Sequence, residues 1–541
     1  MSYKDTYEDW LTWADEETKE ELLRLTDEKE IEDRFYKDLE FGTAGLRGIM
    51  GAGTNRMNRY TVAKATKGLA NYLKKEHPET FSQGVVIAYD SRNHSADFAK
   101  EAARVLTSAG IPVRIFEELE PIPVLSFAVK YFHAAAGVVV TASHNPAEYN
   151  GYKVYGANGA QLVPKDADVL TSYVEAVTDL PHIEDAGNDA LVNWLGHKTV
   201  TRFLTAIFRQ SLYQGNPPLH GSGAKPVQAI LAEAGFTDVH IVKEQESPDG
   251  DFPTVSAPNP ENEDALSMGI ALAKEVGADI VIGTDPDSDR IGSAVRKGED
   301  FDLISGNQMG ALLTYFLCLT RKETLTPAST MVKTVVTGEL GAEIGRRYGL
   351  KVVETLTGFK YIGEKISQWE TDPAHDYFFG YEESYGYLAG THAQDKDAVV
   401  SAMLICEMAA YFKKEGKTLA DVLDELYSDF GYYYDKTTSY TLKGLTGLAK
   451  IQGIMTHLRE IDVKEIFPEI DSVIDFEAGI GDLPKENVLK YMVKTGGWMA
   501  VRPSGTEPKI KIYYSLKGND EKEALAKFAD FKTRWEKELG L

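Results

Sequence analysis

Three aspartates alternate with other residues in the segment Thr284–Arg290, directly after an apolar run that ends at Ile282. This spacing places the carboxylates of Asp285, Asp287 and Asp289 close together at the end of a predicted strand. Carboxylates completed by a substrate phosphate oxygen are the ligands that Mg²⁺ prefers. The segment therefore predicts a magnesium site, and the competing interpretation is an aspartate-rich turn that caps the next helix.

Ser143 follows the apolar run Val138–Val140 and precedes His144, with Lys153 ten residues further along. A serine hydroxyl can carry a phosphoryl group, and nearby cationic groups can stabilise the transferring charge. A phosphoserine brings about two negative charges, which a divalent metal can neutralise. Alone, Ser143 is typical of a turn; together with the acidic segment it indicates phosphoryl transfer.

Three further segments carry groups that can hold a sugar phosphate. Arg502–Thr506 combines a guanidinium group, two hydroxyls and a glycine, which is a composition suited to binding phosphate. Glu382–Ser384 is rich in hydrogen-bond acceptors and suits sugar hydroxyls, and the glycine-rich segment Gly42–Arg47 ends in a second anion-binding side chain. Each segment is also compatible with an ordinary turn.

Strands must position these segments, and short β-branched runs alternate with helix-length segments along most of the chain. This alternation is typical of α/β units with buried, largely parallel strands, in which ligands bind beyond the carboxyl ends of the strands. We expect an amphipathic helical lead-in over the first 40 residues. We expect strands at residues 85–89, 113–116, 137–140, 239–242, 279–282, 331–335, 352–355 and 377–379.

The length of 541 residues indicates three or four domains at roughly 150 residues each. After about residue 432 the pattern changes to tyrosine- and threonine-rich strands and a final charged helix, which favours an α+β domain. The predicted domains are 1–200 with the serine segment, 201–320 with the acidic segment, 321–432 with the sugar-binding segment and 433–541 with the phosphate-binding segment.

Composition excludes several classes of function. With 58 basic and 83 acidic residues the formal charge is −25, so neither nucleic acid nor an anionic membrane is an expected partner. The longest nearly apolar stretch, 309–319, is shorter than the roughly 20 residues that span a bilayer. No secretory signal is visible, and two cysteines in apolar runs indicate a reducing compartment, so we expect a cytoplasmic protein.

With these segments in view, the sequence resembles the α-D-phosphohexomutase superfamily, most closely the branch that contains phosphoglucomutases and phosphopentomutases. The resemblance covers nearly the whole chain, with five motifs in the family's order: Gly42–Arg47, 141–146, Thr284–Arg290, Glu382–Ser384 and Arg502–Thr506. It implies an α/β fold of four domains around a central cleft, three similar mixed α/β domains and a smaller α+β C-terminal domain. It also implies sugar-phosphate partners, in a monomer or weak homodimer.

The resemblance also implies roles for single residues. Ser143 is the expected phosphoserine, and its phosphate joins Asp285, Asp287 and Asp289 as a ligand of Mg²⁺. The residues expected to stabilise the transferring phosphoryl group and handle protons are Arg47, His144, Lys153, Arg290 and Lys396. The residues expected to bind the substrate are Thr357, Gly358, Lys360, Glu382, Ser384, Arg502, Ser504, Gly505 and Thr506. We expect the basic residues among them to line a positive pocket in a negative shell.

The implied reaction interconverts glucose 1-phosphate and glucose 6-phosphate, with glucose 1,6-bisphosphate as intermediate and activator. The segment Ala147–Gly151 lacks the paired glycines of the family's best-known members, which favours the pentomutase-containing branch. Glu-Glu-Ser at Glu382–Ser384, rather than Glu-Met-Ser, favours glucose over mannose. Phosphopentomutase or phosphomannomutase activity, a metal-dependent phosphatase and a non-enzymatic sugar-phosphate binding protein are the alternatives.

Overall fold

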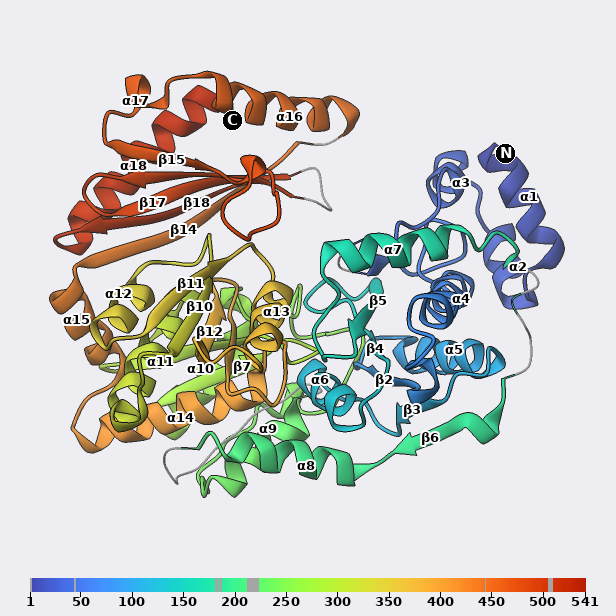
Figure 1. Cartoon of the computed structure of the whole chain (residues 1–541), viewed down its shortest axis with the longest axis horizontal. Coiled ribbons are helices and arrows are strands. Elements are labelled where there is room, and N and C mark those ends of the chain that lie inside the picture. The colour runs from blue at the N-terminus through green and yellow to red at the C-terminus, as the bar shows by residue number, and fades with distance from the viewer. Residues whose placement is uncertain are drawn as a thin grey trace. The chain divides into compact units, whose positions relative to one another are not determined.

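A computed structural model describes residues 2–42, 45–180, 183, 187–211, 223–442, 444–504 and 509–541 of the chain (Figure 1). The chain forms two compact units. The first comprises Met1–Ile304, Phe359–Tyr377 and Tyr385–Tyr411, and the second comprises Ser305–Gly358, Phe378–Ser384 and Phe412–Leu541. Over the described ranges, no helix has both the length and the apolar character needed to cross a membrane.

Three short helices open the first unit: Tyr3–Trp13 (α1), Glu16–Leu23 (α2) and Glu28–Phe35 (α3). Each begins after a side chain that accepts a hydrogen bond from a first-turn N–H, namely Ser2, Asp15 and Asp27. These caps satisfy donors that have no partner inside the helix. The apolar faces meet in a cluster that includes Trp10 and Phe35, which confirms the expected amphipathic lead-in.

A six-stranded sheet forms the centre of the first unit, in the order β1-β5-β4-β2-β3-β6. Its strands are Leu46–Ile49 (β1), Val85–Tyr89 (β2), Val113–Phe116 (β3), Ala136–Val140 (β4), Tyr149–Gly156 (β5) and Val192–Leu195 (β6). β2 pairs in parallel with β3 and β4, and every residue of β4 is buried. Apolar, β-branched strands are typical of sheets covered on both faces. The strands expected at 85–89, 113–116 and 137–140 are confirmed.

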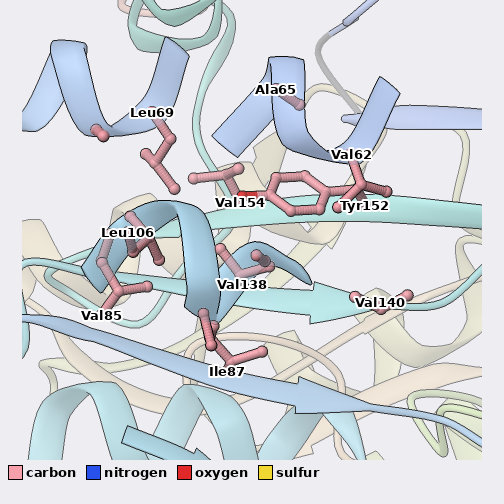
Figure 2. Packing of buried hydrophobic residues seen from close by; sticks show 14 of the residues in the cluster. Val62, Ala65, Leu69, Val85, Ile87, Leu106, Val138, Val140, Tyr152 and Val154 are labelled. Atoms are coloured by element: carbon pink, nitrogen blue, oxygen red, sulfur yellow. The ribbon is translucent and has the colours of Figure 1, made fainter. Parts of the chain in front are cut away.

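Four helices accompany this sheet: Arg59–Glu76 (α4), Ser95–Ser108 (α5), Ile122–Tyr131 (α6) and Pro164–Glu175 (α7). Figure 2 shows Val62, Ala65 and Leu69 of α4 above Tyr152 and Val154 of β5, and all five belong to one buried cluster. This packing fixes β5 beside β4. It thereby anchors both ends of the serine segment that connects these two strands.

A second, three-stranded sheet is antiparallel, in the order β7-β8-β9, and consists of Ile280–Thr284 (β7), Ile291–Lys297 (β8) and Asp300–Ile304 (β9). Helix Glu263–Val276 (α10) packs against β7, and the acidic segment connects β7 to β8. The expected strand at 239–242 is wrong, because these residues, all of them described, form no strand. So short an alternating run does not fix a pairing partner, and its only buried side chain is that of Val242.

The remaining helices and strand of the first unit come from two separate parts of the sequence. They are His197–Phe208 (α8), Ala224–Glu233 (α9), Phe359–Trp369 (α13) and Gly386–Ala389 (β13). Helix Ala398–Lys414 (α14) continues along the chain to the second unit. Cys406 of α14 and Cys318 are both free and buried, as expected.

The second unit contains a parallel pair of strands. Ser329–Thr334 (β10) pairs with Lys351–Thr355 (β11), and Asp376–Glu382 (β12) follows in the order β11-β10-β12. The strands expected at 331–335, 352–355 and 377–379 are confirmed. The associated helices are Gly306–Thr320 (α11), Leu340–Arg347 (α12) and Leu419–Phe430 (α15).

The C-terminal part is a five-stranded antiparallel sheet in the order β14-β18-β17-β16-β15. Its strands are Tyr432–Thr441 (β14), Ile470–Asp475 (β15), Leu489–Val493 (β16), Gly497–Pro503 (β17) and Lys509–Gly518 (β18). Its helices are Gly444–Glu460 (α16), Val463–Ile466 (α17) and Glu521–Leu539 (α18). Phe531 and Trp535 of α18 pack into the core of this sheet, which is the α+β arrangement expected from the sequence.

A buried ion network joins the two sheets of the second unit. Glu354 of β11 accepts contacts from Lys333 of β10 at 2.8 Å and from Lys490 of β16 at 3.0 Å. Lys490 also lies over the ring of Trp498 on β17, the strand that leads to Arg502. Burial alone raises the pKa of Glu354, but the two ammonium groups lower it from 4.5 to about 2. The carboxylate therefore holds the C-terminal sheet against β10 and β11.

This network predicts a pH dependence of stability. Because the pKa of Glu354 is lower in the folded chain, its stabilisation is complete above pH 4.5 and is lost as the pH falls toward about 2. We expect Glu354→Gln to flatten the decline of the free energy of unfolding over that interval, measured by urea denaturation. The control is Glu477→Gln, whose partly exposed carboxylate pairs with Arg459. Equal slopes in wild type and Glu354→Gln would contradict the prediction.

The core cluster of the first unit predicts a second effect on stability. Leu69 is fully buried between α4 and the sheet. Leu69→Ala should lower the free energy of unfolding by about 2–5 kcal/mol, because it removes buried methyl groups and leaves a cavity. Leu23→Ala, at a leucine that is 67% exposed, should change it by less than about 0.5 kcal/mol. Similar losses in the two variants, measured by denaturant unfolding, would refute this account of the core.

Candidate active site

Ser143 lies in the connection between β4 and β5, with a left-handed backbone at φ +53°. Its hydroxyl donates a hydrogen bond to Asp285 Oδ2 at 2.9 Å, and its N–H donates to Thr141 Oγ1 at 2.8 Å. Left-handed backbone is uncommon for residues with a Cβ, and such strain gathers at functional sites. The turn thus brings the serine hydroxyl onto the acidic segment, which lies 142 residues away in the sequence.

The three aspartates of the acidic segment form one cluster. Asp285, Asp287 and Asp289 are all buried, and each offers a carboxylate oxygen within 4.8 Å of the others. In the described part of the chain, one oxygen of Asp287 and one of Asp289 have no hydrogen-bond partner. Buried polar atoms normally have partners, and hard oxygen ligands suit a divalent cation. The donor set therefore fits a metal ion held by these three residues.

Burial and the neighbouring charges together determine the protonation of the cluster. Burial and the charges of Asp287 and Asp289 raise the pKa of Asp285 well above its ordinary value. Burial also raises the pKa of Asp289, although Lys396 opposes this effect. Burial alone raises the pKa of Asp287, but Lys153 lowers it below its ordinary range. The cluster therefore favours bound positive charge.

Two lysines supply part of that charge. Lys153 Nζ, on β5, lies 3.0 Å from Asp287 Oδ2. Lys396 Nζ lies 3.0 Å from Asp289 Oδ2 and 3.1 Å from Asp395 Oδ1. Both predicted lysines thus contact the metal-binding carboxylates directly, although they are 243 positions apart in the sequence.

Two arginines and a histidine complete this group. Arg290 lies with its Nε 3.9 Å from Asp289 Oδ1, and Arg47 donates a hydrogen bond to Asn145 Oδ1 at 3.0 Å. His144 Nδ1 is 3.1 Å from Ser143 Oγ. Burial, Arg290 and Arg47 lower the pKa of His144 to about 2, so its imidazole is neutral beside the Ser143 hydroxyl.

The structure adds Arg92 and Glu261, which were not predicted as part of the site, and it gives a contact for Thr141 of the predicted motif 141–146. Arg92 donates hydrogen bonds to several carbonyls of the serine segment, and Thr141 Oγ1 donates to Asp287 Oδ2 at 3.1 Å. Glu261 pairs with Arg290 at 2.6 Å. The sequence does contain a signal for Arg92. The segment Asp90–Arg92 directly follows the carboxyl end of β2, where site residues are expected.

The second unit positions the predicted sugar-binding residues. Glu382 Oε1 accepts a hydrogen bond from the N–H of Gly358 at 2.9 Å, and Gly358 has φ +119°, a conformation that favours glycine. This contact brings the Thr357–Gly358 turn onto the sugar-binding segment. Glu383 instead accepts hydrogen bonds from the hydroxyls of Thr334 and Thr337 at 3.4 and 3.3 Å, so its role within the fold differs from that of Glu382.

The predicted phosphate-binding segment is described in part. Arg502 Nε contacts Glu486 Oε1 at 2.8 Å, and the Ser504 N–H donates to the Lys509 carbonyl at 2.8 Å. Gly505 and Thr506 lie outside the described residues. Lys360, in α13, lies over the ring of Tyr361 at 5.4 Å, and Ser384 follows β12. The convergence of Ser384, Lys360 and Arg502 with Ser143 stays a prediction.

Comparison with known proteins decides the family. Family models described as phosphoglucomutase/phosphomannomutase alpha/beta/alpha domains I, II and III match residues 38–180, 211–298 and 305–430, and the model of the C-terminal domain matches 460–531. A phosphoglucomutase from Staphylococcus epidermidis is 38% identical over 94% of this chain and 96% of its own. The chain belongs to the phosphoglucomutase/phosphomannomutase family. A phosphoglucomutase from Staphylococcus aureus is 35% identical over 94% of this chain and 95% of its own.

Solved structures agree on the fold. A phosphoglucomutase/phosphomannomutase family protein from Burkholderia thailandensis superposes with a TM-score of 0.68 at 17% identity, covering 92% of this chain and 96% of its own. The phosphoglucomutase parafusin from Paramecium gives a TM-score of 0.67 at 16% identity, covering 92% and 94%. The four-domain architecture, with three α/β/α domains and a C-terminal domain, is confirmed. The protein is a phosphohexomutase, an isomerase, and its family implies sugar-phosphate substrates.

The aspartate cluster predicts a measurable response to metal. Adding MgCl₂ to chelator-treated protein should raise the thermal midpoint, since a ligand at 100 times its dissociation constant stabilises by about 2.7 kcal/mol. Asp289→Asn should lose most of this increase. Asp302→Asn, at a half-exposed aspartate on β9, is the matched control and should respond like wild type. An unchanged response in Asp289→Asn would exclude the cluster as the metal site.

Proposed function

We propose that the protein is a phosphoglucomutase that interconverts α-D-glucose 1-phosphate and glucose 6-phosphate through phospho-Ser143 and glucose 1,6-bisphosphate. The observation that carries the proposal is the 2.9 Å contact between Ser143 Oγ and Asp285, within a buried cluster of three aspartates and two lysines. Relatives that share 35–38% identity along nearly the whole chain are named phosphoglucomutase, which supports it.

In the proposed reaction, phospho-Ser143 gives its phosphoryl group to the free hydroxyl of the bound sugar monophosphate. The bond between phosphorus and Ser143 Oγ breaks, a bond from phosphorus to the sugar oxygen forms, and the hydroxyl proton is ultimately taken up by Ser143 Oγ. The resulting bisphosphate turns over and returns its other phosphoryl group to Ser143 by the reverse step. Lys153, Lys396, Arg290 and Arg47 supply fixed positive charge for the transfer, which depends mostly on positioning and electrostatics.

We propose Mg²⁺ as the ion held by Asp285, Asp287 and Asp289. When bound, Mg²⁺ would stabilise the negative charge on the phosphoryl oxygens. His144 Nδ1 lies 3.1 Å from Ser143 Oγ and would offer a hydrogen bond beside the phosphoserine.

We propose substrate-binding roles for the residues of the predicted sugar-binding and phosphate-binding segments. Glu382 and Ser384, with Thr357, Gly358 and Lys360, would contact sugar hydroxyls, and Arg502, Ser504, Gly505 and Thr506 would hold the phosphate that is not reacting. Because one set of residues would contact the sugar and another would hold the phosphate that is not reacting, the bisphosphate would bind in both orientations. We propose that the domain boundaries lie near residues 200, 320 and 432 and that each domain carries one functional segment. We also propose that the protein is a cytoplasmic monomer or weak homodimer.

The assay that tests the proposal uses purified protein, glucose 1-phosphate, MgCl₂ and catalytic glucose 1,6-bisphosphate. Wild type should form glucose 6-phosphate, and Ser143→Ala should reduce kcat by more than about 1,000-fold, because the group that carries phosphate is lost. Ser172→Ala, at an exposed serine on α7, is the control and should retain activity.

Other outcomes separate the alternatives. Release of inorganic phosphate without glucose 6-phosphate would identify a phosphatase, and binding of glucose 1-phosphate without turnover would identify a binding protein. Faster turnover of mannose 1-phosphate or ribose 1-phosphate than of glucose 1-phosphate would overturn the sugar assignment while leaving the phosphoserine chemistry intact.

A further inference from the structure

We propose that Arg92 is a positioning residue that holds the Ser143 turn in its left-handed conformation and fixes the hydroxyl against the acidic cluster. The inference rests on the proposed role of Ser143. The hydrogen bonds that Arg92 donates go to the backbone around Ser143, and its effect on the hydroxyl is therefore indirect.

Sheet topology places Arg92 beside the serine turn. β2 and β4 are parallel neighbours, with Tyr89 paired to Val140 at their carboxyl ends. The Asp90–Arg92 segment therefore leaves the sheet next to the segment that leads to Ser143. The Asp90 N–H donates to the Val140 carbonyl at 3.2 Å, which keeps the two segments together beyond the last paired residues.

The guanidinium of Arg92 binds four carbonyl oxygens between Ser143 and Tyr149, the first residue of β5. Nη2 donates to the carbonyl of Ser143 at 2.6 Å and to that of Asn145. Nη1 donates to the carbonyls of Pro146 at 2.8 Å and Tyr149 at 3.1 Å. The Ser143 and Asn145 carbonyls lie in the irregular segment between β4 and β5, and Arg92 provides them with hydrogen-bond donors. The Pro146 carbonyl also accepts a hydrogen bond from the Tyr149 N–H at 3.1 Å.

This contact opposes the relaxation of the serine turn. The left-handed region is disfavoured for a residue with a Cβ, and Ser143 would leave it by rotating the peptide whose carbonyl Arg92 holds. Only a planar group with several fixed donors can bind all four oxygens at once, and a lysine ammonium has neither that reach nor that geometry.

Two further contacts hold the guanidinium itself. Its side chain is fully buried against Asp90, with Nε 3.4 Å from Asp90 Oδ2, so its charge is compensated. Its other face lies 5.0 Å from the ring centroid of Phe252. The segment around Phe252 is attached to the same place, because Asn93 Nδ2 donates to Asp251 Oδ1 at 2.7 Å. Arg92 thus contacts both the serine turn and the part of the chain that precedes the acidic segment.

The test measures phosphorylation of Ser143 and turnover separately. Arg92→Ala should lower kcat by about 100-fold with little change in KM, which is the size of effect that a misplaced reacting group produces. The rate at which glucose 1,6-bisphosphate phosphorylates Ser143, followed by intact-protein mass, should fall in parallel. Added guanidinium at non-denaturing concentration should restore part of the rate in Arg92→Ala, whereas sodium chloride at equal ionic strength should not.

Arg296 provides a matched control. It also donates to backbone carbonyls, with Nε 2.8 Å from the Ala278 oxygen, and also lies over a phenylalanine ring, that of Phe301 at 4.9 Å. Arg296→Ala should retain the rate of Ser143 phosphorylation and show no rescue by guanidinium. If Arg92→Ala does not fold, Arg92→Lys takes its place, and it should fold with a reduced rate.

The inference is overturned if folded Arg92 variants phosphorylate Ser143 at the wild-type rate, or if the loss in Arg92→Ala is not rescued and equals that in Arg296→Ala. It is also overturned if Arg92→Lys fails to fold while Arg296→Lys folds, because Arg92 would then act on the fold as a whole. Failure of the proposed function is a different result, since wild type itself would then neither take up phosphate on Ser143 nor form glucose 6-phosphate.

Discussion

Repulsion among three buried carboxylates is the constraint on which the site depends. Asp285, Asp287 and Asp289 place oxygens within 4.8 Å of one another, and each pair of like charges at that range costs on the order of 3–4 kcal/mol at an effective dielectric of 20. Exposed ion pairs contribute only about 0–1 kcal/mol each. Buried cations must therefore compensate the cluster, and Lys153, Lys396 and a metal ion are placed to do so.

The scaffold brings these charges together by ending different elements at one place. β4 leads to Ser143, the β7–β8 hairpin carries the aspartates, β5 carries Lys153 and the segment after β13 carries Lys396. The packing of α4 on β5 fixes the far end of the serine turn (Figure 2). Within the first unit, positive side chains thus gather around the acidic cluster even though the chain carries a formal charge of −25.

The second unit meets a similar electrostatic requirement with different residues. Its two sheets are joined by the buried contacts of Glu354 with Lys333 and Lys490. In the same unit, the hydrogen bond from Gly358 to Glu382 orders the predicted sugar-binding segment. A buried pair is costly to form and more costly to break, so this network specifies how β16 and β17 lie on β10 and β11.

The sequence by itself determined the α/β class, the strands at 85–89, 137–140 and 331–335, and the aspartates and serine that form the cluster. Those features depend on local patterns of apolar residues and on motifs of a few residues. Only the tertiary structure decided that Glu261 and Arg92 belong beside them, because contacts between segments far apart in the sequence depend on the fold rather than on neighbouring residues. The expected strand at 239–242 failed for the same reason: a run of four residues forms a strand only if a partner is available, and pairing is a property of the whole fold.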